Sequence, residues 1–94
     1  MIRSFKNQET ERVFLRLRSR RLPPDVARSA LRKLLLIHGA VVVDDLKVPP
    51  GNRLEKLTGD RAGQFSVRVN DQWRICFSWL DGEAHDVEIV DYHS

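Results

Sequence analysis

Two arginines stand in neighbouring stretches of the sequence whose side chains alternate between apolar and polar. Residues 65–70 carry Arg68 at a polar position, and residues 73–80 carry Arg74. Because successive side chains of a β-strand point to opposite faces, the alternation predicts two strands whose apolar residues face a core. Both arginines then project from the other face of the sheet.

The link between these stretches is short, since it consists of Asn70-Asp71-Gln72. We therefore expect Arg68 and Arg74 on adjacent strands, within reach of one shared anion. Two like charges at that separation are unfavourable without a counter-charge. A phosphate would supply it, whereas in the alternative interpretation acidic neighbours such as Glu88 neutralise the arginines in a surface ion-pair cluster.

A second group that could do chemistry lies at the C-terminal end of the sequence. Asp91, Tyr92 and His93 are consecutive and follow an apolar-rich stretch. Acid, phenol and imidazole suit acid–base chemistry on a phosphodiester, because histidine titrates near neutral pH. Strand alternation puts Asp91 and His93 on one face and Tyr92 on the other, so convergence of all three requires a bend. The alternative interpretation is a frayed terminus without a function.

The elements that position these residues follow from hydrophobic periodicity and turn residues. We expect a short strand at residues 2–5, a helix from Asn7 or Thr10 to Arg20, and a second helix that begins near Pro24 and has Gly39 just beyond its end, as the C′ residue. A connector at 41–52, a further strand at 53–57, and strands at 65–70, 73–80 and 84–92 follow. Asp81-Gly82 is a hairpin signal between the last two strands. This order predicts an α+β domain over residues 1–94, with the N-terminal strand and a two-helix hairpin packed on one face of a small antiparallel sheet.

The charge is distributed unevenly along the 94 residues. Residues 1–38 hold ten Lys and Arg against three Asp and Glu, whereas residues 39–94 hold six against ten. A basic half suggests a polyanion such as RNA, or an acidic protein segment, as partner. Two amphipathic helices with solvated basic faces would give the same pattern.

Composition excludes several classes of protein. The single cysteine, Cys76, rules out an internal disulfide and a thiolate metal cluster. The three histidines lack metal-ligand spacing, so we expect no metal and no cofactor.

The longest apolar stretch, residues 34–43, is interrupted and far shorter than the about 20 residues of a membrane span. With no secretory signal at the polar start, we expect a cytoplasmic protein without a membrane partner. A chain this short also favours a shallow surface groove over an enclosed active site.

Three segments together resemble one family of proteins. The segments are residues 49–61, residues 64–75 with their Trp-Arg-Ile strand, and residues 87–93 with the terminal Asp-Tyr-His. They look like the HigB-type toxins of the RelE/ParE superfamily, also known as plasmid maintenance killer proteins. The resemblance implies the RelE-like fold and a toxin of a bacterial type II toxin–antitoxin pair. Such toxins are ribosome-dependent endoribonucleases that cut translated mRNA. A helix-turn-helix antitoxin, HigA, neutralises them, and operator DNA is bound through the complex.

The resemblance also implies roles for individual residues. Arg68 and Arg74 match the phosphate-contacting arginines of the family, and Asp91, Tyr92 and His93 match its catalytic cluster. Some members have His and Lys where this sequence has Glu55 and Thr58. Glu55 then becomes a candidate base, and we expect RNA phosphates to be contacted by Lys56, Arg53 and Arg61. Alternation places Glu55 and Lys56 on opposite faces, which disfavours both roles together.

The mechanism that follows is a metal-independent transesterification in which the RNA 2′-hydroxyl attacks the adjacent phosphate. Two other functions stay open on the sequence alone. One is a non-enzymatic gyrase inhibitor, as in the ParE branch of the superfamily, and the other is an inactive relative that only binds an antitoxin.

Overall fold

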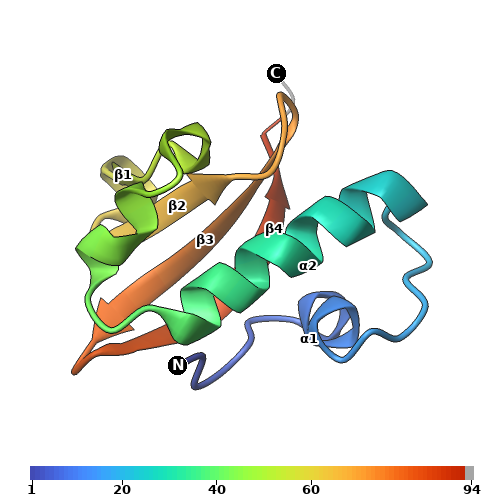
Figure 1. Ribbon diagram of the computed structural model, residues 1–94, viewed down its shortest axis with the longest axis horizontal. Helices are drawn as coiled ribbons and strands as arrows, with labels where there is room; N and C mark the ends of the chain where they lie inside the picture. Colours follow the sequence, from blue (N-terminus) through green and yellow to red (C-terminus); the bar gives the residue numbers. More distant parts are fainter. Residues whose placement is uncertain (93–94) are drawn as a thin grey trace.

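The computed structural model describes residues 1–92, which form one antiparallel sheet with two helices on one of its faces (Figure 1). The strands lie in the order β1, β2, β3, β4, and their bounds are Glu55–Lys56, Gln64–Arg68, Trp73–Leu80 and Glu83–Asp91. The helices are α1, Gln8–Phe14, and α2, Pro24–Gly39, and three 3-10 helices follow, η1 at Val43–Lys47, η2 at Pro50–Asn52 and η3 at Gly59–Arg61. The predicted α+β architecture is confirmed.

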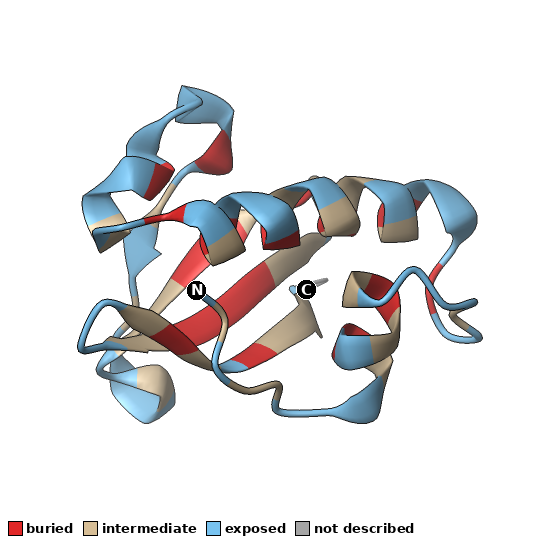
Figure 2. Cartoon of the chain, turned by 60° about the horizontal axis from the view of Figure 1, so that its bottom comes forward, coloured by how far each residue is buried: buried red, intermediate tan, exposed pale blue. Residues whose placement is uncertain are grey.

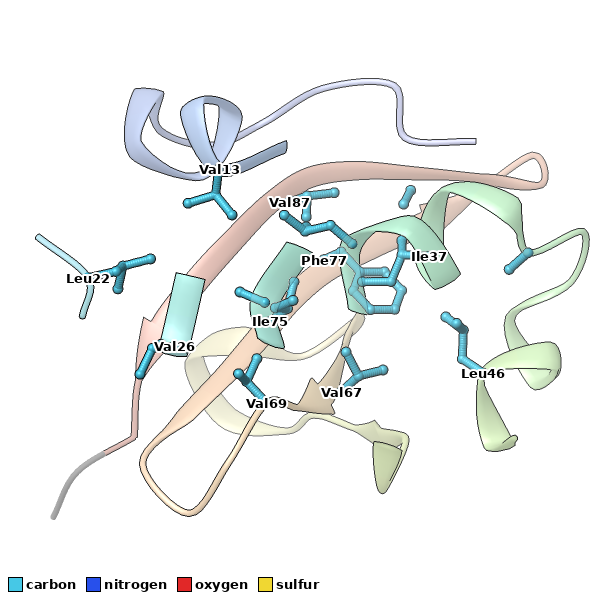
Figure 3. Packing of buried hydrophobic residues seen from close by; sticks show 14 residues of the cluster. Val13, Leu22, Val26, Ile37, Leu46, Val67, Val69, Ile75, Phe77 and Val87 are labelled. Atoms are coloured by element: carbon cyan, nitrogen blue, oxygen red, sulfur yellow. The ribbon is translucent and has the colours of Figure 1, made fainter. Parts of the chain in front are cut away.

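The apolar face of the sheet and the apolar side of α2 pack against each other in one core. From α2 come Val26, Ala30, Leu34 and Ile37, all buried, so residues three or four positions apart put one side of this helix in the core. The sheet supplies its apolar face, and Figure 3 shows Val67, Ile75, Phe77 and Val87 against this helix. Buried positions therefore gather between the helix layer and the sheet, while the outer surface of α2 stays exposed (Figure 2). Burial of each such side chain contributes about 1.5–3 kcal/mol.

The first helix is shorter than the sequence predicts. Expected to reach Arg20, α1 ends at Phe14, and Arg16 takes a positive φ of 60°. The chain turns away here because Leu22 must reach the core, where only 7% of it stays exposed. The guanidinium of Arg12 holds the turn by donating to the carbonyl oxygen of Arg18, at 2.9 Å from Nη2. Helical spacing of the apolar residues alone could not reveal this tertiary demand.

Two predicted strands are also reduced. Residues 53–57 keep only the two-residue β1, and residues 2–5 make two isolated parallel bridges to β4, Ile2 to Ala84 and Phe5 to Val87. Both segments lie at sheet edges, where a strand has a neighbour on one side only, so fewer hydrogen bonds hold it in register.

In the part of the chain that the structure describes, no helix is long and apolar enough to cross a membrane.

The outer edge of β4 is closed by the N-terminal segment and by α1. The backbone N–H groups of Ala84 and Val87 donate to the carbonyl oxygens of Met1 and Ser4, each at 3.0 Å. Farther along, the N–H of Ile89 donates to the hydroxyl oxygen of Thr10 at 3.0 Å. Thr10 is only 1% exposed, so this side chain replaces a missing neighbouring strand inside the protein.

We therefore predict that Thr10→Val, which keeps the shape and removes the acceptor, lowers the free energy of unfolding by about 1–3 kcal/mol, because a buried N–H loses its partner. Urea denaturation followed by circular dichroism measures the change. Thr58→Val is the matched control, since Thr58 is exposed. Equal stability of the two variants would show that Ile89 does not depend on the threonine hydroxyl.

Candidate active site

The two arginines singled out by the sequence lie directly opposite each other on the sheet face away from the helices. In the antiparallel pairing of β2 with β3, Arg68 is the register partner of Arg74. The predicted adjacency is confirmed. A second row of register partners crosses the same face and runs from Glu55 through Ser66 and Cys76 to Glu88.

Arg74 is fixed by groups on its own side of the sheet. Its Nε donates to the hydroxyl of Ser66 at 2.8 Å, and its Nη2 donates to the backbone carbonyl of Arg53 at 2.8 Å. The same Nη2 lies 3.5 Å from a carboxylate oxygen of Glu55, and the Arg74 side chain is only 14% exposed. The guanidinium is therefore oriented before any ligand arrives.

The backbone of Arg53 explains one of these contacts. This residue has φ 46° and ψ 55°, the left-handed conformation, and it ends the 3-10 helix η2. The turn directs its carbonyl oxygen toward Arg74. The sequence predicted a phosphate contact by the Arg53 side chain, and the structure adds a second contribution, from the main chain.

Arg68 has a different environment. It pairs with Asp71 in the β2–β3 turn, whose side chain is fully exposed. Exposed ion pairs contribute about 0–1 kcal/mol, so an incoming phosphate can displace this one at small cost. The two arginines thus differ, because Arg74 is held in place and Arg68 is free to change its partner.

Acidic neighbours do pair with both arginines, as the ion-pair alternative expected, but they are Asp71 for Arg68 and Glu55 for Arg74, and not Glu88. The Glu88 carboxylate pairs instead with Arg61 at 3.2 Å, and Arg61 also donates to Gln64 at 3.2 Å. The sequence could not show this, because Arg61 reaches the sheet from η3 through a loop whose path depends on the whole fold. Arg61, expected to contact phosphate, is already engaged with a carboxylate.

Tyr92 reaches the same face as Arg74. Its ring centroid lies 5.8 Å from the guanidinium carbon of Arg74, and its hydroxyl lies 3.6 Å from the sulfur of Cys76. Burial and the contact with Cys76 raise the pKa of the Tyr92 phenol. The phenol therefore keeps its proton at neutral pH and can donate a hydrogen bond.

Asp91 lies on the other side of β4. It is the register partner of Trp73, and its carboxylate accepts a hydrogen bond from the side-chain amide of Gln72 at 3.2 Å. Strand alternation predicted this separation from Tyr92. His93, the third member of the predicted cluster, lies outside the described residues.

Two open hollows meet at Tyr92. One, of about 430 Å³, is lined by Arg53, Arg68, Asn70, Asp71, Arg74 and Tyr92. The other, of about 240 Å³, is lined by Glu55, Lys56, Leu57, Thr58, Asp60, Arg61 and Tyr92. Together they form the groove, the shallow surface feature expected for so short a chain. Lys56 lines it as well as Glu55, although the register keeps the expected alternation, since Glu55 pairs with Ser66 and Lys56 with Phe65.

Sequence reasoning missed two residues that support this groove, Ser66 and Cys76. Their signal was present, because strand alternation puts Ser66 on the same face as Arg68 and Cys76 on the same face as Arg74. Only the structure shows that Ser66 contacts Arg74 and that Cys76 contacts Tyr92. Among residues 1–92, no group of three or more His, Cys, Asp or Glu side chains could hold a metal ion.

Comparison with known proteins decides the family. A family model described as the RelE-like toxin HigB of a type II toxin–antitoxin system matches residues 3–93. The chain belongs to this family of HigB-like toxins. The resemblance seen in the sequence is thereby confirmed, and the chain is a type II toxin of the RelE-like kind.

Individual relatives agree with this assignment. The chain is 43% identical over 67 residues to Toxin HigB-1 of Vibrio cholerae, covering 71% of this chain and 70% of that protein. It is 30% identical over 93 residues to Endoribonuclease HigB of Proteus vulgaris, covering 99% of this chain and all of that protein. The solved YoeB–YefM complex of Staphylococcus aureus contains a chain of the same fold, with a TM-score of 0.63 at 18% identity, covering 100% of this HigB-like toxin and 99% of that chain.

The thiol beneath Tyr92 generates a prediction about alkaline stability. Burial is the largest cause that raises the pKa of Cys76, which is 1% exposed, above its ordinary value of 9.0. The unfolded chain therefore loses this proton at a lower pH than the folded chain, so the thiol's contribution to stability is complete below about pH 9 and falls as pH rises.

We predict that the free energy of unfolding of the wild type falls more steeply above pH 9 than that of Cys76→Ala. Urea denaturation at a series of pH values from neutral to alkaline measures both slopes. The variant also loses some stability at every pH through the missing sulfur, and neutral pH gives that baseline. Parallel curves would show that Cys76 ionises equally easily in both states.

Proposed function

We propose that this HigB-like toxin is an endoribonuclease that cleaves mRNA during translation, with the groove as its active site. The observation that carries the proposal is the fixed guanidinium of Arg74, opposite Arg68 and beside the Tyr92 ring. Two cations and an aromatic ring in an open groove fit one phosphodiester with an adjacent unstacked base. The name of the Proteus vulgaris relative, Endoribonuclease HigB, supports the same chemistry.

The reaction that we propose is a transesterification within the RNA. The 2′-oxygen forms a bond to the adjacent phosphorus, and the bond from phosphorus to the 5′-oxygen breaks. The products are a 2′,3′-cyclic phosphate and a free 5′-hydroxyl. Arg74 and Arg68 stabilise the negative charge that develops on the phosphorane oxygens, and each well-placed donor contributes about 3–4 kcal/mol to the transition state. Tyr92 donates a hydrogen bond from its phenol or stacks on a base.

A base must remove the 2′-proton and an acid must protonate the 5′-oxygen. We propose Glu55 as the base, because its exposed carboxylate lies in the groove at 3.5 Å from Arg74. His93 suits the acid because imidazole titrates near neutral pH. Asp91, predicted as part of the same cluster, lies on the other side of β4 and is the less suitable candidate. Each such group contributes about 10²-fold or more. Lys56 and Arg53 line the groove and provide phosphate contacts on either side of the cleaved bond.

The proposed partners follow from the family and the charge. We propose that a HigA-like helix-turn-helix antitoxin neutralises the toxin, that the ribosome presents the mRNA, that operator DNA is bound only through the complex, and that all of this happens in the cytoplasm. Two solved structures of the same fold are complexes of YoeB with YefM from Staphylococcus aureus, one of them described as a toxin–antitoxin complex. The basic N-terminal half suits both RNA and an acidic partner.

Arg74→Ala tests the active site. We predict at least tenfold less mRNA cleavage, because the variant loses an oriented cation at the phosphate. Primer extension on an mRNA translated in a purified system measures the cuts, with a parallel reaction that lacks ribosomes. Arg28→Ala, an exposed arginine on α2, is the control and should cut like the wild type.

Two outcomes would contradict the proposal. Full activity of folded Arg74→Ala would place the active site elsewhere. If folded wild type makes no ribosome-dependent cuts, the nuclease proposal fails, and a DNA supercoiling assay then tests the gyrase inhibitor against the inactive relative.

Glu55→Gln tests the base. The amide keeps the size of the side chain and cannot accept a proton, so we predict a loss of cleavage of about tenfold or more. Glu11→Gln, at an exposed position of α1, is the matched control. Single-turnover cleavage on stalled ribosomes measures the chemical step. An unchanged rate for Glu55→Gln would rule out Glu55 as the base and leave His93 as the candidate.

A further inference from the structure

The side chain of Asn52, at the end of η2, joins three segments of the chain. Its amide nitrogen donates to the backbone carbonyl oxygens of Leu46 and Val48, each at 3.2 Å. Its amide oxygen accepts a hydrogen bond from Nζ of Lys33, on α2, at 2.5 Å. Asn52 is only 1% exposed, so these three contacts satisfy the polar atoms of a side chain that is almost completely buried.

The contacts of Asn52 hold the connector between α2 and β1 to the rest of the protein. Figure 1 shows this connector in green, with η1 and η2 in it. Leu46 is 2% exposed, and its side chain points into the core in Figure 3. The position of Asn52 is therefore fixed from the core through Leu46 and from the helix layer through Lys33.

The ammonium group of Lys33 depends on the Asn52 oxygen. Burial is the largest cause that lowers the pKa of Lys33, and the positive charges of Arg32 and Arg68 lower it further. Within residues 1–92, Lys33 forms no ion pair. A charge that is partly removed from water needs a hydrogen-bond acceptor, and the amide oxygen of Asn52 is that acceptor.

Arg53 follows Asn52 directly and connects it to the groove. Its φ of 46° and ψ of 55° are left-handed, a conformation that a residue with a Cβ keeps only where its surroundings impose it. The N–H of Arg53 donates to the carbonyl oxygen of Pro50 at 3.0 Å, and its own carbonyl oxygen accepts Nη2 of Arg74 at 2.8 Å. A shift of Asn52 would therefore move the acceptor that orients Arg74.

We propose that Asn52 and Lys33 are positioning residues for the cleavage reaction, because they fix the carbonyl oxygen of Arg53 and, through it, the guanidinium of Arg74. This inference rests on the proposed nuclease function and extends its machinery beyond the groove, which neither residue lines. A donor that is oriented in advance stabilises the transition state without reorganising. Loss of either residue should therefore slow the chemical step and leave RNA binding unchanged.

Asn52→Ala tests the proposal, with Thr10→Val as its matched control. Both residues are 1% exposed and both variants lose buried hydrogen bonds, but Thr10 supports β4 through Ile89 and not Arg74. Single-turnover cleavage on stalled ribosomes is measured at increasing toxin concentration. We expect the maximal rate of Asn52→Ala to fall about tenfold or more, with the half-saturating concentration within about twofold of wild type. Thr10→Val should cleave like the wild type.

Lys33→Met is a milder variant that removes one contact at a half-buried position. It carries the test where the circular dichroism of Asn52→Ala does not match wild type. We expect a maximal rate about threefold lower or more, because the Asn52 amide loses one of its three anchors. Lys47→Met, which removes an exposed lysine from η1 in the same connector, should cleave like the wild type.

An NMR signal from Arg74 itself separates positioning from a loss of charge. Its Nε–H donates to Ser66, and the exchange of this proton with water reports how firmly the guanidinium is held. We expect exchange about fivefold faster or more in Asn52→Ala and Lys33→Met, and wild-type exchange in both control variants.

Slower cleavage together with faster exchange at Arg74 supports the proposal. Slower cleavage with unchanged exchange would show an effect of charge or of general stability and would overturn it, and so would wild-type cleavage by the folded variants. A change in the half-saturating concentration alone would assign the two residues to RNA binding and also overturn it. If the wild type makes no cuts, the nuclease proposal fails, and exchange at Arg74 still decides whether Asn52 and Lys33 orient its guanidinium.

Discussion

The period-two alternation of β2 and β3 is the constraint on which the structure depends. The side chains on one face of these strands form the core against α2, with Val67, Ile75 and Phe77 at its centre. The side chains on the other face form the groove, with Arg68 opposite Arg74. A slip of one residue in either strand would bury guanidinium groups and expose the core, so packing and active site share one register. Hydrophobic burial thereby fixes the separation of the two cations.

This coupling explains how much the sequence could predict. Alternation and the short turn predicted the strands, the adjacency of the arginines and the separation of Asp91 from Tyr92. The end of α1 was predicted wrongly, because Leu22 draws the chain into the core and no local pattern shows that. The pairing of Glu88 with Arg61 was not predicted, because the two residues are 27 positions apart in the chain. Local periodicity predicts elements, and contacts between distant segments complete the site.

The two arginines of the groove illustrate two ways of holding a cation. Arg74 has a hydroxyl, a carbonyl and a carboxylate around it and little exposure, so its orientation costs no further entropy when a ligand binds. Arg68 is paired with one exposed carboxylate, which an incoming phosphate can displace at small cost. A rigid donor suits the charge that develops during reaction, and an adaptable donor suits capture of an RNA chain. The distinction depends on two uncharged groups, the hydroxyl of Ser66 and the backbone carbonyl of Arg53.

The closed edge of β4 has a consequence for recognition. Met1 to Lys6 and the Thr10 hydroxyl already satisfy the main-chain groups there, and the opposite edge consists of the two-residue β1. A partner therefore finds little free backbone to extend the sheet by strand addition, the mode in which main-chain hydrogen bonds give affinity with little regard to sequence. Association must be carried by side chains. In a cell with several related toxins and antitoxins, such a fold makes cross-reaction a matter of surface residues, and a pair can diverge from its relatives by substitutions that leave the sheet untouched.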